Sequence, residues 1–352
     1  MGFQLTIEPL GETIELEEGE RLLDGCLRAG IQLPYACHHG LCGTCKVQVL
    51  EGEVAHCAEA SPFALMDIER DEGKCLACAS TLLSDCIIEA DVDEEPDACN
   101  YPVHEFTARV AEVIALTPTV RGITLELAGG LAFQAGQYLN LHVPGVAGPR
   151  AFSIASSPSR AGQLDLHIRK VEGGAATRWL CDELVVGDSL RVTGPLGRFF
   201  VRHSSPEPLL FLAGGTGLSS PRAMVLERLE AGDARPLTLI HGVRAQEELY
   251  LEEEFRELAA RHPNFEYIPA VSGDAPAWQG ERGLVHEVAI RRFGGRFAGL
   301  RAYLCGPPAM IDACLAALMQ GRLFERDIFV ERFFTQADGV AGAARSPLFK
   351  RL

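Results

Sequence analysis

The stretch YACHHGLCGTC, residues 35–45, holds three cysteines and two histidines in eleven positions. Its cysteines, Cys37, Cys42 and Cys45, are spaced C-x4-C-x2-C. Zinc sites usually pair one C-x2-C knuckle with a second Cys or His pair farther away, and a Rieske centre needs histidine in its second ligand pair. The plant-type [2Fe-2S] pattern has this spacing and a distant fourth cysteine. The spacing therefore predicts a [2Fe-2S] cluster, with the two histidines at the loop surface.

The chain has 352 residues, 47% hydrophobic and 23% charged, which is typical of a globular protein with two or three domains. Residues 1–20 lack the basic and apolar regions of a signal peptide. No apolar run approaches the roughly 18 residues that span a bilayer. We therefore expect a cytoplasmic protein without a membrane partner. Its twelve cysteines should stay mostly reduced, which favours a metal site over a disulfide framework.

The negative charge is concentrated in the first part of the chain. Residues 1–100 contain 5 Lys and Arg against 21 Asp and Glu, a net charge of −16, while residues 101–352 balance at 27 against 27. Such an acidic surface is a poor partner for nucleic acid. The excess acid can serve solubility alone or form a docking face for a basic partner protein, and the sequence leaves both open. The candidate docking face is the patch at 61–72, which includes Asp67 and Glu69.

Hydrophobic patterns divide the chain into three domains and a linker. Residues 1–95 predict a small α+β domain, residues 96–104 a linker, residues 105–204 an antiparallel β-barrel, and residues 205–352 a parallel sheet with alternating helices. The elements predicted in the first domain are strands at 3–8, 12–17, 46–50 and 86–92, a helix at 19–30 and a helical patch at 61–72.

Two cysteines compete for the fourth ligand position, Cys75 and Cys78 in GKCLACAS. Spacing alone does not decide between them. The segment LACASTLLSDCIIEADV, residues 76–92, resembles the end of plant-type ferredoxin domains, in which the ligand precedes a Ser-Asp-Cys strand by the same interval. The resemblance implies that Cys78 is the fourth ligand and that the domain has a β-grasp fold. Cys75 is then expected to be a packing thiol.

The segment GPRAFSIASSP, residues 148–158, resembles the Arg-x-Tyr-Ser signature of the ferredoxin–NADP reductase superfamily, whose barrel binds FAD. The resemblance implies that Arg150 pairs with the FAD pyrophosphate, a role that suits a planar and always-charged donor. It also implies that Ser153 offers its hydroxyl near flavin N5. Phe152 stands where the family often has Tyr, so ring packing is expected without the phenolic oxygen.

The segment KVEGGAATRWL, residues 170–180, resembles the Gly-Gly-x-x-Ser/Thr motif of the same superfamily, which opens a helix. The resemblance implies that Gly173, Gly174 and Thr177 direct N–H groups and a helix dipole toward the FAD phosphates. Arg169, immediately before this segment, is assigned to the same cofactor site. The two motifs in order, inside a strand-rich segment, indicate an FAD domain.

The segment LAGGTGLSSP, residues 212–221, leads from a predicted strand into a helix. It is not a G-x-G-x-x-G fingerprint, because Ser220 replaces the last glycine, and it is not a Walker loop, because no Gly-Lys follows. A Gly-rich turn between a strand and a helix still lets the backbone approach a phosphate closely. The residues assigned to this nucleotide turn are Gly214, Gly215, Thr216 and Gly217.

The segment AYLCGPPAMI, residues 302–311, resembles the Cys-Gly-Pro-Pro motif of the superfamily, which borders the nicotinamide. The resemblance implies that Cys305, Gly306 and Pro307 lie at the nicotinamide. Cys305, together with the serine proposed near flavin N5, is expected to flank the hydride transfer. VERFF near the C-terminus matches the place where the family sets an aromatic ring against the flavin, which implies that role for Phe333.

The segment HGVRAQEELY, residues 241–250, follows the second predicted strand of the nucleotide domain. It contains one cation, Arg244, followed by Glu247 and Glu248. Carboxylates there would repel a 2′-phosphate and accept hydrogen bonds from ribose hydroxyls. The sequence therefore predicts a preference for NADH over NADPH.

Together the motifs cover nearly the whole chain in the order ferredoxin, FAD barrel, nicotinamide domain. This order resembles the single-chain reductases of bacterial multicomponent oxygenases, most closely the phenol hydroxylase group. The resemblance implies that hydride passes from NADH to FAD and that single electrons then pass through the cluster to a separate diiron hydroxylase. The alternatives are the reductase of a ring-hydroxylating dioxygenase and, from another class, a redox-sensing regulator. The chain by itself is expected to be a monomer.

Overall fold

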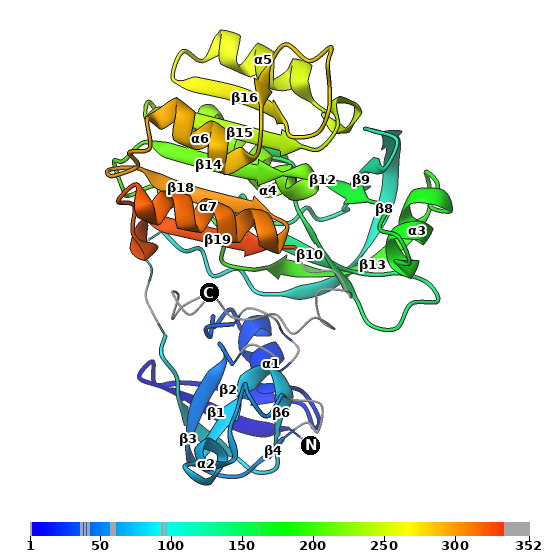
Figure 1. Cartoon of the computed structure of the whole chain (residues 1–352). Helices are drawn as coiled ribbons and strands as arrows, with labels where there is room; N and C mark the ends of the chain where they lie inside the picture. Colours follow the sequence, from blue (N-terminus) through cyan, green and yellow to red (C-terminus); the bar gives the residue numbers. More distant parts are fainter. Residues whose placement is uncertain are drawn as a thin grey trace. The chain divides into compact units, whose positions relative to one another are not determined.

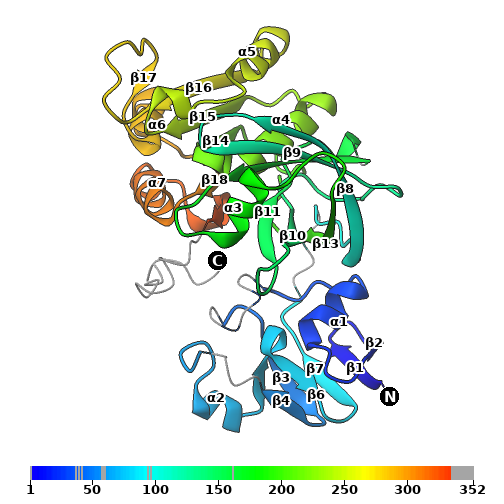
Figure 2. The same cartoon turned by 90° about the vertical axis from the view of Figure 1, so that its right-hand side faces the viewer.

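The computed structural model describes residues 2–35, 38, 40, 43–56, 61–92, 95, 97–160 and 162–333. The chain forms two compact units, the first ending at His104 and the second beginning at Glu105 (Figure 1, Figure 2). Two of the predicted cluster ligands, Cys37 and Cys42, lie outside the described residues. Within the described part of the chain, no helix is long and apolar enough to cross a membrane.

The first unit is built around a five-stranded mixed sheet, which confirms the predicted β-grasp domain. In sheet order its strands are β2 (Glu12–Leu16), β1 (Phe3–Glu8), β7 (Cys86–Glu89), β3 (Lys46–Glu51) and β5 (Lys74–Leu76). Strands β1 and β7 run parallel, and the other neighbours run antiparallel. A two-stranded sheet of β4 (Val54–His56) and β6 (Ser80–Leu82) completes the unit.

Both helices predicted in this unit are present but shorter than their sequence patterns. Helix α1 spans Leu22–Arg28, and of the patch at 61–72 only α2 (Asp67–Asp71) is helical. The residues before α2 form a turn instead, because Pro62 cannot donate a helical hydrogen bond and Ser61 donates its N–H to the Gly40 carbonyl at 3.0 Å. This bond ties the start of the patch to the cysteine loop.

The second unit begins with a six-stranded antiparallel sheet that curls into a near-barrel, as predicted. In sheet order its strands are β11 (Arg150–Ser153), β10 (Tyr138–His142), β13 (Ser189–Leu196), β8 (His104–Ala115), β9 (Val120–Glu126) and β12 (Gln163–Arg169). A bridge between Ile154 and Leu166 brings the two edges together. Alternate residues of β12 (Leu164, Leu166 and Ile168) are fully buried in the barrel core. Helix α3 (Ala175–Asp182) follows β12.

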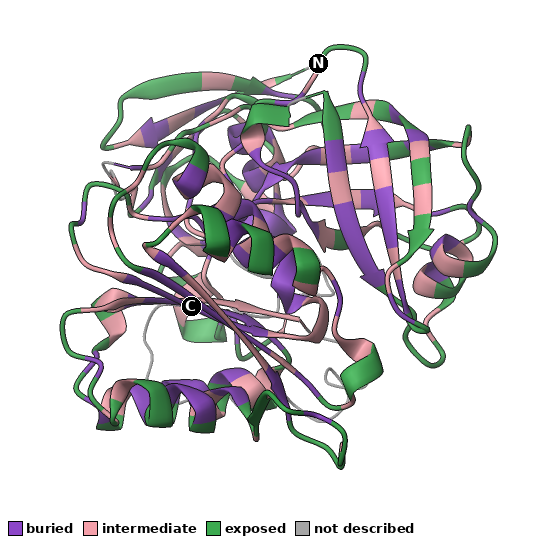
Figure 3. Ribbon diagram, turned by 90° about the horizontal axis from the view of Figure 1, so that it is seen from above, coloured by how far each residue is buried: buried purple, intermediate pink, exposed green. Residues whose placement is uncertain are grey.

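The remainder of the second unit is a six-stranded parallel sheet with helices on both faces. In sheet order its strands are β17 (Glu281–Arg282), β16 (Phe265–Val271), β15 (Leu237–Val243), β14 (Leu209–Gly214), β18 (Arg301–Gly306) and β19 (Ile328–Arg332). The helices are α4 (Ser219–Glu230), α5 (Glu252–Arg261), α6 (Val285–Phe293) and α7 (Pro308–Gln320). The three central strands, β15, β14 and β18, are largely buried, and the helices alternate buried and exposed bands (Figure 3).

The side-chain pattern of β14 explains why this sheet is covered twice. Leu209 and Phe211 belong to the core that holds α4 and α5, whereas Leu210 and Leu212 belong to the core that holds α6 and α7. A strand whose successive residues face opposite sides can be apolar throughout only if helices cover both faces. The continuous apolar run before the Gly-rich turn is therefore a central strand.

The strand order fixes where a ligand of this sheet can bind. From β14 the chain moves outward through β15, β16 and β17, and it then returns to place β18 on the other side of β14. The strand order therefore reverses between β14 and β18, and ligands of open parallel sheets bind at the carboxyl ends of the strands at such a reversal. The Gly-rich turn begins at the end of β14, and the Cys-Gly-Pro-Pro segment begins at the end of β18.

Candidate active site

The cysteine loop is tied to the segment that carries the candidate fourth ligand. Gly40 donates its N–H to Cys78 Sγ at 3.2 Å, and Ala77 donates its N–H to the Cys45 carbonyl at 2.9 Å. Gly40 has a φ of 71°, which glycine adopts without steric cost. N–H groups that point at cysteine sulfur stabilise thiolate ligands and tune cluster potentials. The described part of the loop therefore fits a [2Fe-2S] cluster.

The two candidates for the fourth ligand lie in different surroundings. Cys75 pairs with Val47 between β5 and β3 and is completely buried. Burial raises the pKa of its thiol to about 12, although a hydrogen bond with Ser80 lowers it. A cluster ligand must be a thiolate. Cys78 is buried as well, at 1% exposure, so burial does not separate the two cysteines; Cys78 is the one that accepts an N–H from the cysteine loop.

Three polar side chains of the second unit donate hydrogen bonds to one carboxylate oxygen of Glu331. We call these four residues the Glu331 cluster. Glu331 Oε2 accepts hydrogen bonds from Ser220 Oγ at 2.6 Å, from Ser153 Oγ at 3.1 Å and from Cys305 Sγ at 3.3 Å. Ser153 ends strand β11 of the barrel, whereas the other three residues come from α4, β18 and β19 of the parallel sheet. The cluster therefore joins the barrel to the sheet at the strand reversal.

The protonation of the Glu331 cluster follows from its burial. Burial raises the pKa of the Glu331 carboxyl, and the hydrogen bonds from Ser220, Cys305 and Ser153 lower it in part. Cys305 is completely buried, and burial together with the neighbouring carboxyl raises its thiol pKa well above the ordinary value. Cys305 is therefore a thiol that donates to Glu331.

The Gly-rich turn packs directly on the Cys-Gly-Pro-Pro segment. A Cβ on Gly217 would lie 2.2 Å from the Cys305 carbonyl oxygen, so only glycine permits this approach. Phe333 donates its N–H to the Gly306 carbonyl at 2.9 Å, and Pro307 immediately precedes α7. The structure thus brings the residues predicted for the phosphate turn, from Gly214 through Gly217, against those predicted at the nicotinamide, from Cys305 through Pro307, with Phe333 beside them.

Arg169 crosses from the barrel to the nucleotide turn. Its guanidinium donates to Glu248 Oε1 at 2.8 Å. A Cβ on Gly215 would lie 3.5 Å from Arg169 Nη1. Glu248 Oε2 also accepts the N–H groups of Arg244 and Ala245 at 3.1 and 3.3 Å. One cation and one carboxylate therefore stand beside the turn predicted to hold the nucleotide phosphates.

The other barrel predictions lie on separate parts of the barrel. Arg150 bonds the carbonyls of its own loop, residues 147–149, at 3.0 to 3.2 Å. Phe152 packs against the barrel core. Helix α3 starts after Gly174, with Gly173 before it. Thr177 Oγ1 accepts the Val171 N–H at 3.1 Å and donates to the Gly174 carbonyl at 3.3 Å.

Three domain models match successive parts of the chain. A 2Fe-2S iron–sulfur cluster binding domain matches residues 5–83, an oxidoreductase FAD-binding domain residues 107–201, and an oxidoreductase NAD-binding domain residues 211–315. The reductase component of phenol 2-monooxygenase from Pseudomonas sp. strain CF600 is 56% identical over the full length of both chains. The phenol hydroxylase P5 protein of Acinetobacter pittii strain PHEA-2 is 54% identical, also over the full length of both.

The chain belongs to the ferredoxin–FAD–NADH reductase family of bacterial oxygenase systems. This reductase is an NADH-dependent oxidoreductase with [2Fe-2S], FAD-binding and NAD-binding domains. Among solved structures, a cytochrome P450 reductase from Amycolatopsis resembles it with a TM-score of 0.86 and 36% identity, over 94% of this chain and 98% of the other. The predicted family, fold and cofactors are confirmed.

The barrel of this reductase fits FAD. Within the described residues, no side chain caps the first turn of α3, and the first N–H groups of a helix have no partner inside the helix. Nothing lies within 4 Å of a Cβ placed on Gly173, so a phosphate can approach that backbone. Ser153 of the Glu331 cluster offers a hydroxyl at the edge of the barrel that faces the nucleotide sheet.

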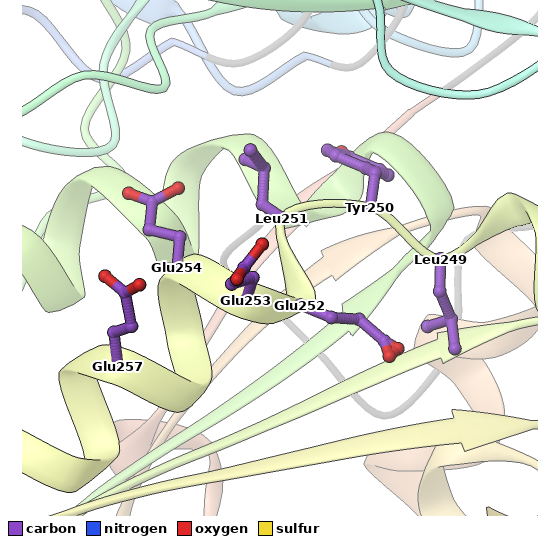
Figure 4. Close-up of a pocket in the computed structure, with 7 residues that line it drawn as sticks. All are labelled: Leu249, Tyr250, Leu251, Glu252, Glu253, Glu254 and Glu257. Carbon is purple, nitrogen blue, oxygen red and sulfur yellow. The ribbon is translucent and has the colours of Figure 1, made fainter.

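A hollow of about 570 Å³ lies beside the start of α5 (Figure 4). Its lining consists of Leu249, Tyr250, Leu251, Glu252, Glu253, Glu254 and Glu257. Four carboxylates would repel a nucleotide or flavin phosphate. This hollow of the reductase therefore does not fit the phosphates of a dinucleotide.

Sequence reasoning missed two members of the Glu331 cluster. Ser220 was noted only as the residue that replaces the last glycine of a dehydrogenase fingerprint, and VERFF pointed to its first aromatic residue, Phe333, and not to Glu331. The sequence did contain one sign of Glu331. This carboxylate lies between Val330 and Arg332 in strand β19, and a carboxylate inside a sheet needs a polar partner. The partners themselves come from residues 26 to 178 positions away, which no local pattern reveals.

Proposed function

We propose that this reductase supplies electrons to a phenol or related aromatic monooxygenase. It takes hydride from NADH and delivers single electrons through its [2Fe-2S] cluster to a separate diiron hydroxylase. The full-length identity of 56% to a phenol 2-monooxygenase reductase component carries the choice of partner. The Glu331 cluster, at the junction of the barrel and the nucleotide sheet, supports hydride transfer at that place. The proposed domains are residues 1–95, 105–204 and 205–352, with residues 96–104 as the linker.

Bound FAD would supply the chemistry that no side chain provides, because it accepts two electrons together and releases them singly. We propose that Arg150 and the start of α3, from Gly173 to Thr177, hold its phosphates, and that Phe152 packs beside its ring. Ser153 would present its hydroxyl oxygen to the flavin edge, because its single O–H donates to Glu331. Buried groups that are already hydrogen-bonded need little rearrangement when a ligand binds.

For NADH, the proposed site lies between the Gly-rich turn and the Cys-Gly-Pro-Pro segment. Thr216 and its glycine neighbours would approach the pyrophosphate, with Arg169 as the nearby cation. Cys305 and Pro307 would border the nicotinamide, and Phe333 would cover the flavin ring. Cys305 keeps its proton, because burial raises its pKa well above the ordinary value. It therefore acts by packing and hydrogen bonding and not as a nucleophile.

Electrons would leave through the first unit. We propose Cys37, Cys42, Cys45 and Cys78 as the cluster ligands. The face that meets the hydroxylase would be the segment at 61–72, because Ser61 is bonded to the cysteine loop. On that segment Phe63 is 91% exposed, Ile68 63% and Met66 53%, and Asp67, Asp71 and Glu72 are exposed beside them. Apolar side chains with an acidic border fit a partner whose apolar recess is bordered by Lys and Arg.

Reconstitution tests this function and separates it from the alternatives. The reductase, loaded with FAD and cluster, is mixed with NADH and either a purified phenol hydroxylase or the oxygenase of a ring-hydroxylating dioxygenase. We expect substrate hydroxylation coupled to NADH oxidation only with the phenol hydroxylase. Coupling only with the dioxygenase would move the assignment to that class. NADH oxidation with cytochrome c but with neither oxygenase would leave the hydride chemistry and remove the proposed partner.

A further inference from the structure

One buried histidine of the nucleotide sheet, His241, has no role in the proposed hydride transfer. His241 lies on β15 opposite Ala213 of β14, two residues before the Gly-rich turn reaches Gly215. Its side chain is completely buried. Its Nε2 lies 3.1 Å from the Gly215 carbonyl oxygen. The contact therefore links the second strand of the sheet to the first residue of the turn.

The chemistry of the two atoms fixes the direction of this bond. A carbonyl oxygen only accepts, so Nε2 of His241 carries the proton and donates it to the bond with Gly215. In the neutral ring Nδ1 is then an acceptor, and it is buried with no hydrogen-bond partner among the described residues. An unpaired buried acceptor costs free energy. Within the described residues, the bond from Nε2 to the Gly215 carbonyl is the only hydrogen bond of this imidazole.

Aromatic contacts hold the ring in the orientation that this bond requires. The His241 and Tyr250 rings meet edge to face, with centroids 5.5 Å apart at 84°. Tyr250 meets His167 of the barrel in the same way, at 5.2 Å and 88°, and its hydroxyl lies 3.4 Å from His167 Nδ1. His167 and Tyr250 are 8% and 4% exposed. The imidazole is thus packed against Tyr250, which in turn packs against His167.

The backbone conformation of Gly215 needs a contact from outside the turn to fix it. It opens the helical turn Gly215–Leu218, which continues directly into α4, and its φ is 55°. Glycine populates many backbone conformations, so one conformation must be selected by contacts. The first N–H groups of a helix have no partner inside it and serve phosphates only if the turn holds its shape. A donor that fixes the Gly215 carbonyl selects that shape.

We propose that His241 is a positioning residue for nucleotide binding: its Nε2–H holds the Gly215 carbonyl and so pre-forms the turn that receives the NADH pyrophosphate. The inference rests on the proposed assignment of that turn as the phosphate site. His241 touches neither nucleotide nor flavin in this account. Its contribution is to the affinity for the phosphates and not to the hydride step.

Calorimetric titration of the fully loaded reductase with ADP-ribose tests the proposal, because ADP-ribose carries the pyrophosphate and has no nicotinamide to react. His241→Phe keeps a ring and removes the donor, whereas His241→Gln keeps an N–H donor at similar reach. Tyr250→Phe is the control, because it keeps the ring that encloses His241 and removes only the hydroxyl. Thermal unfolding of each variant records its stability separately.

We expect the ADP-ribose Kd to rise about tenfold in His241→Phe, to stay within about threefold of the wild-type value in His241→Gln, and to be unchanged in Tyr250→Phe. The limiting rate of flavin reduction at saturating NADH should stay within about twofold of wild type in all three. Equal affinity in wild type and His241→Phe would overturn the proposal. Equal weakening in the Phe and Gln variants would also overturn it, as would failure of both to fold, since Gln retains the donor. If wild type itself does not bind ADP-ribose, the proposed phosphate site fails instead.

Discussion

Replacing His241 with glutamine should reduce the loss of folding stability that the second unit suffers at acid pH. Burial lowers the pKa of His241 from 6.5 to about 4. In the unfolded chain the same imidazole titrates near its ordinary value. Between these two values the unfolded state binds more protons than the folded state, so stability rises with pH. The stability that depends on a neutral His241 is fully present above about pH 6.5 and is lost as the pH falls toward 4.

The magnitude follows from the shift. A change from 6.5 to about 4 is about 2.5 pKa units, or about 3.4 kcal/mol in total. Integrated over the titration, about 2 kcal/mol of this is lost between pH 7.5 and pH 5. His167 acts in the same direction, because burial, Arg222 and His241 lower its pKa. Glu331 acts in the opposite direction, because burial raises its pKa. A comparison of wild type with the variant at each pH therefore isolates most of the His241 contribution.

Tryptophan fluorescence during urea unfolding is the suitable assay, because Trp179 and Trp278 both lie in the second unit and are the only tryptophans of the chain. We expect wild type to lose about 2 kcal/mol more than His241→Gln when the pH falls from 7.5 to 5. The urea m-value should not differ between the two proteins. Parallel stability curves for the two proteins, within about 0.5 kcal/mol, would refute the claim that this histidine is buried as a neutral ring.

Three further predictions concern the cluster, the nucleotide and the partner. Cys78→Ser should abolish the [2Fe-2S] absorbance while flavin remains, and Cys75→Ser should retain the cluster; iron analysis with the reverse result would exchange the two assignments. Glu248→Gln should raise kcat/KM for NADPH about tenfold, because it removes a carboxylate that repels a 2′-phosphate, and comparable wild-type values for the two nucleotides would contradict the preference for NADH. Asp67→Lys combined with Asp71→Lys should slow turnover coupled to the hydroxylase and leave flavin reduction by NADH unchanged, because exposed charges steer association and are screened beyond about 8 Å at physiological salt. If coupled turnover does not depend on salt or on these substitutions, the excess Asp and Glu residues of the first unit serve solubility only.

The docking test uses Asp71 instead of Glu69 because the structure gives Glu69 another role. Lys46 Nζ donates to Glu69 Oε1 at 2.5 Å, and the Met66 N–H donates to Glu69 Oε2 at 3.0 Å. These bonds lower the pKa of Glu69 and fix the start of α2. Charge reversal at this position would therefore disturb the fold as well as the surface. The sequence showed an acidic patch, but it could not separate acids bound to the protein from acids free to meet a partner.

Local spacing predicted much of this molecule. The cysteine loop and the Gly-rich turn are contiguous, so their residue types alone indicate a cluster and a phosphate turn. The continuous apolar run of β14 was read correctly as a strand of a parallel sheet. Local patterns failed where neighbours in space are distant in sequence. Ser153 and Glu331 are 178 positions apart, and only the strand reversal brings them into contact.

The patch at 61–72 shows a second limit. Its spacing is compatible with a helix throughout, yet Pro62 and the bond from Ser61 to the cysteine loop hold its first half in a turn. That bond comes from tertiary structure, and it competes with helix propensity successfully because propensity differences are small. The choice between Cys75 and Cys78 has the same character. Both fit the spacing, and they differ in the surroundings that the fold provides.

Anaerobic reduction of the purified reductase by NADH, followed by flavin absorbance and by electron paramagnetic resonance, reports on the flavin and the cluster separately. We expect NADH to bleach the flavin and to produce the paramagnetic signal of a reduced [2Fe-2S] cluster. The same protein without FAD should give no cluster signal, and the Cys78→Ser variant should show flavin reduction alone. Rapid flavin reduction with a cluster that stays oxidised, or cluster reduction by NADH without FAD, would contradict an electron path from NADH through FAD to the cluster.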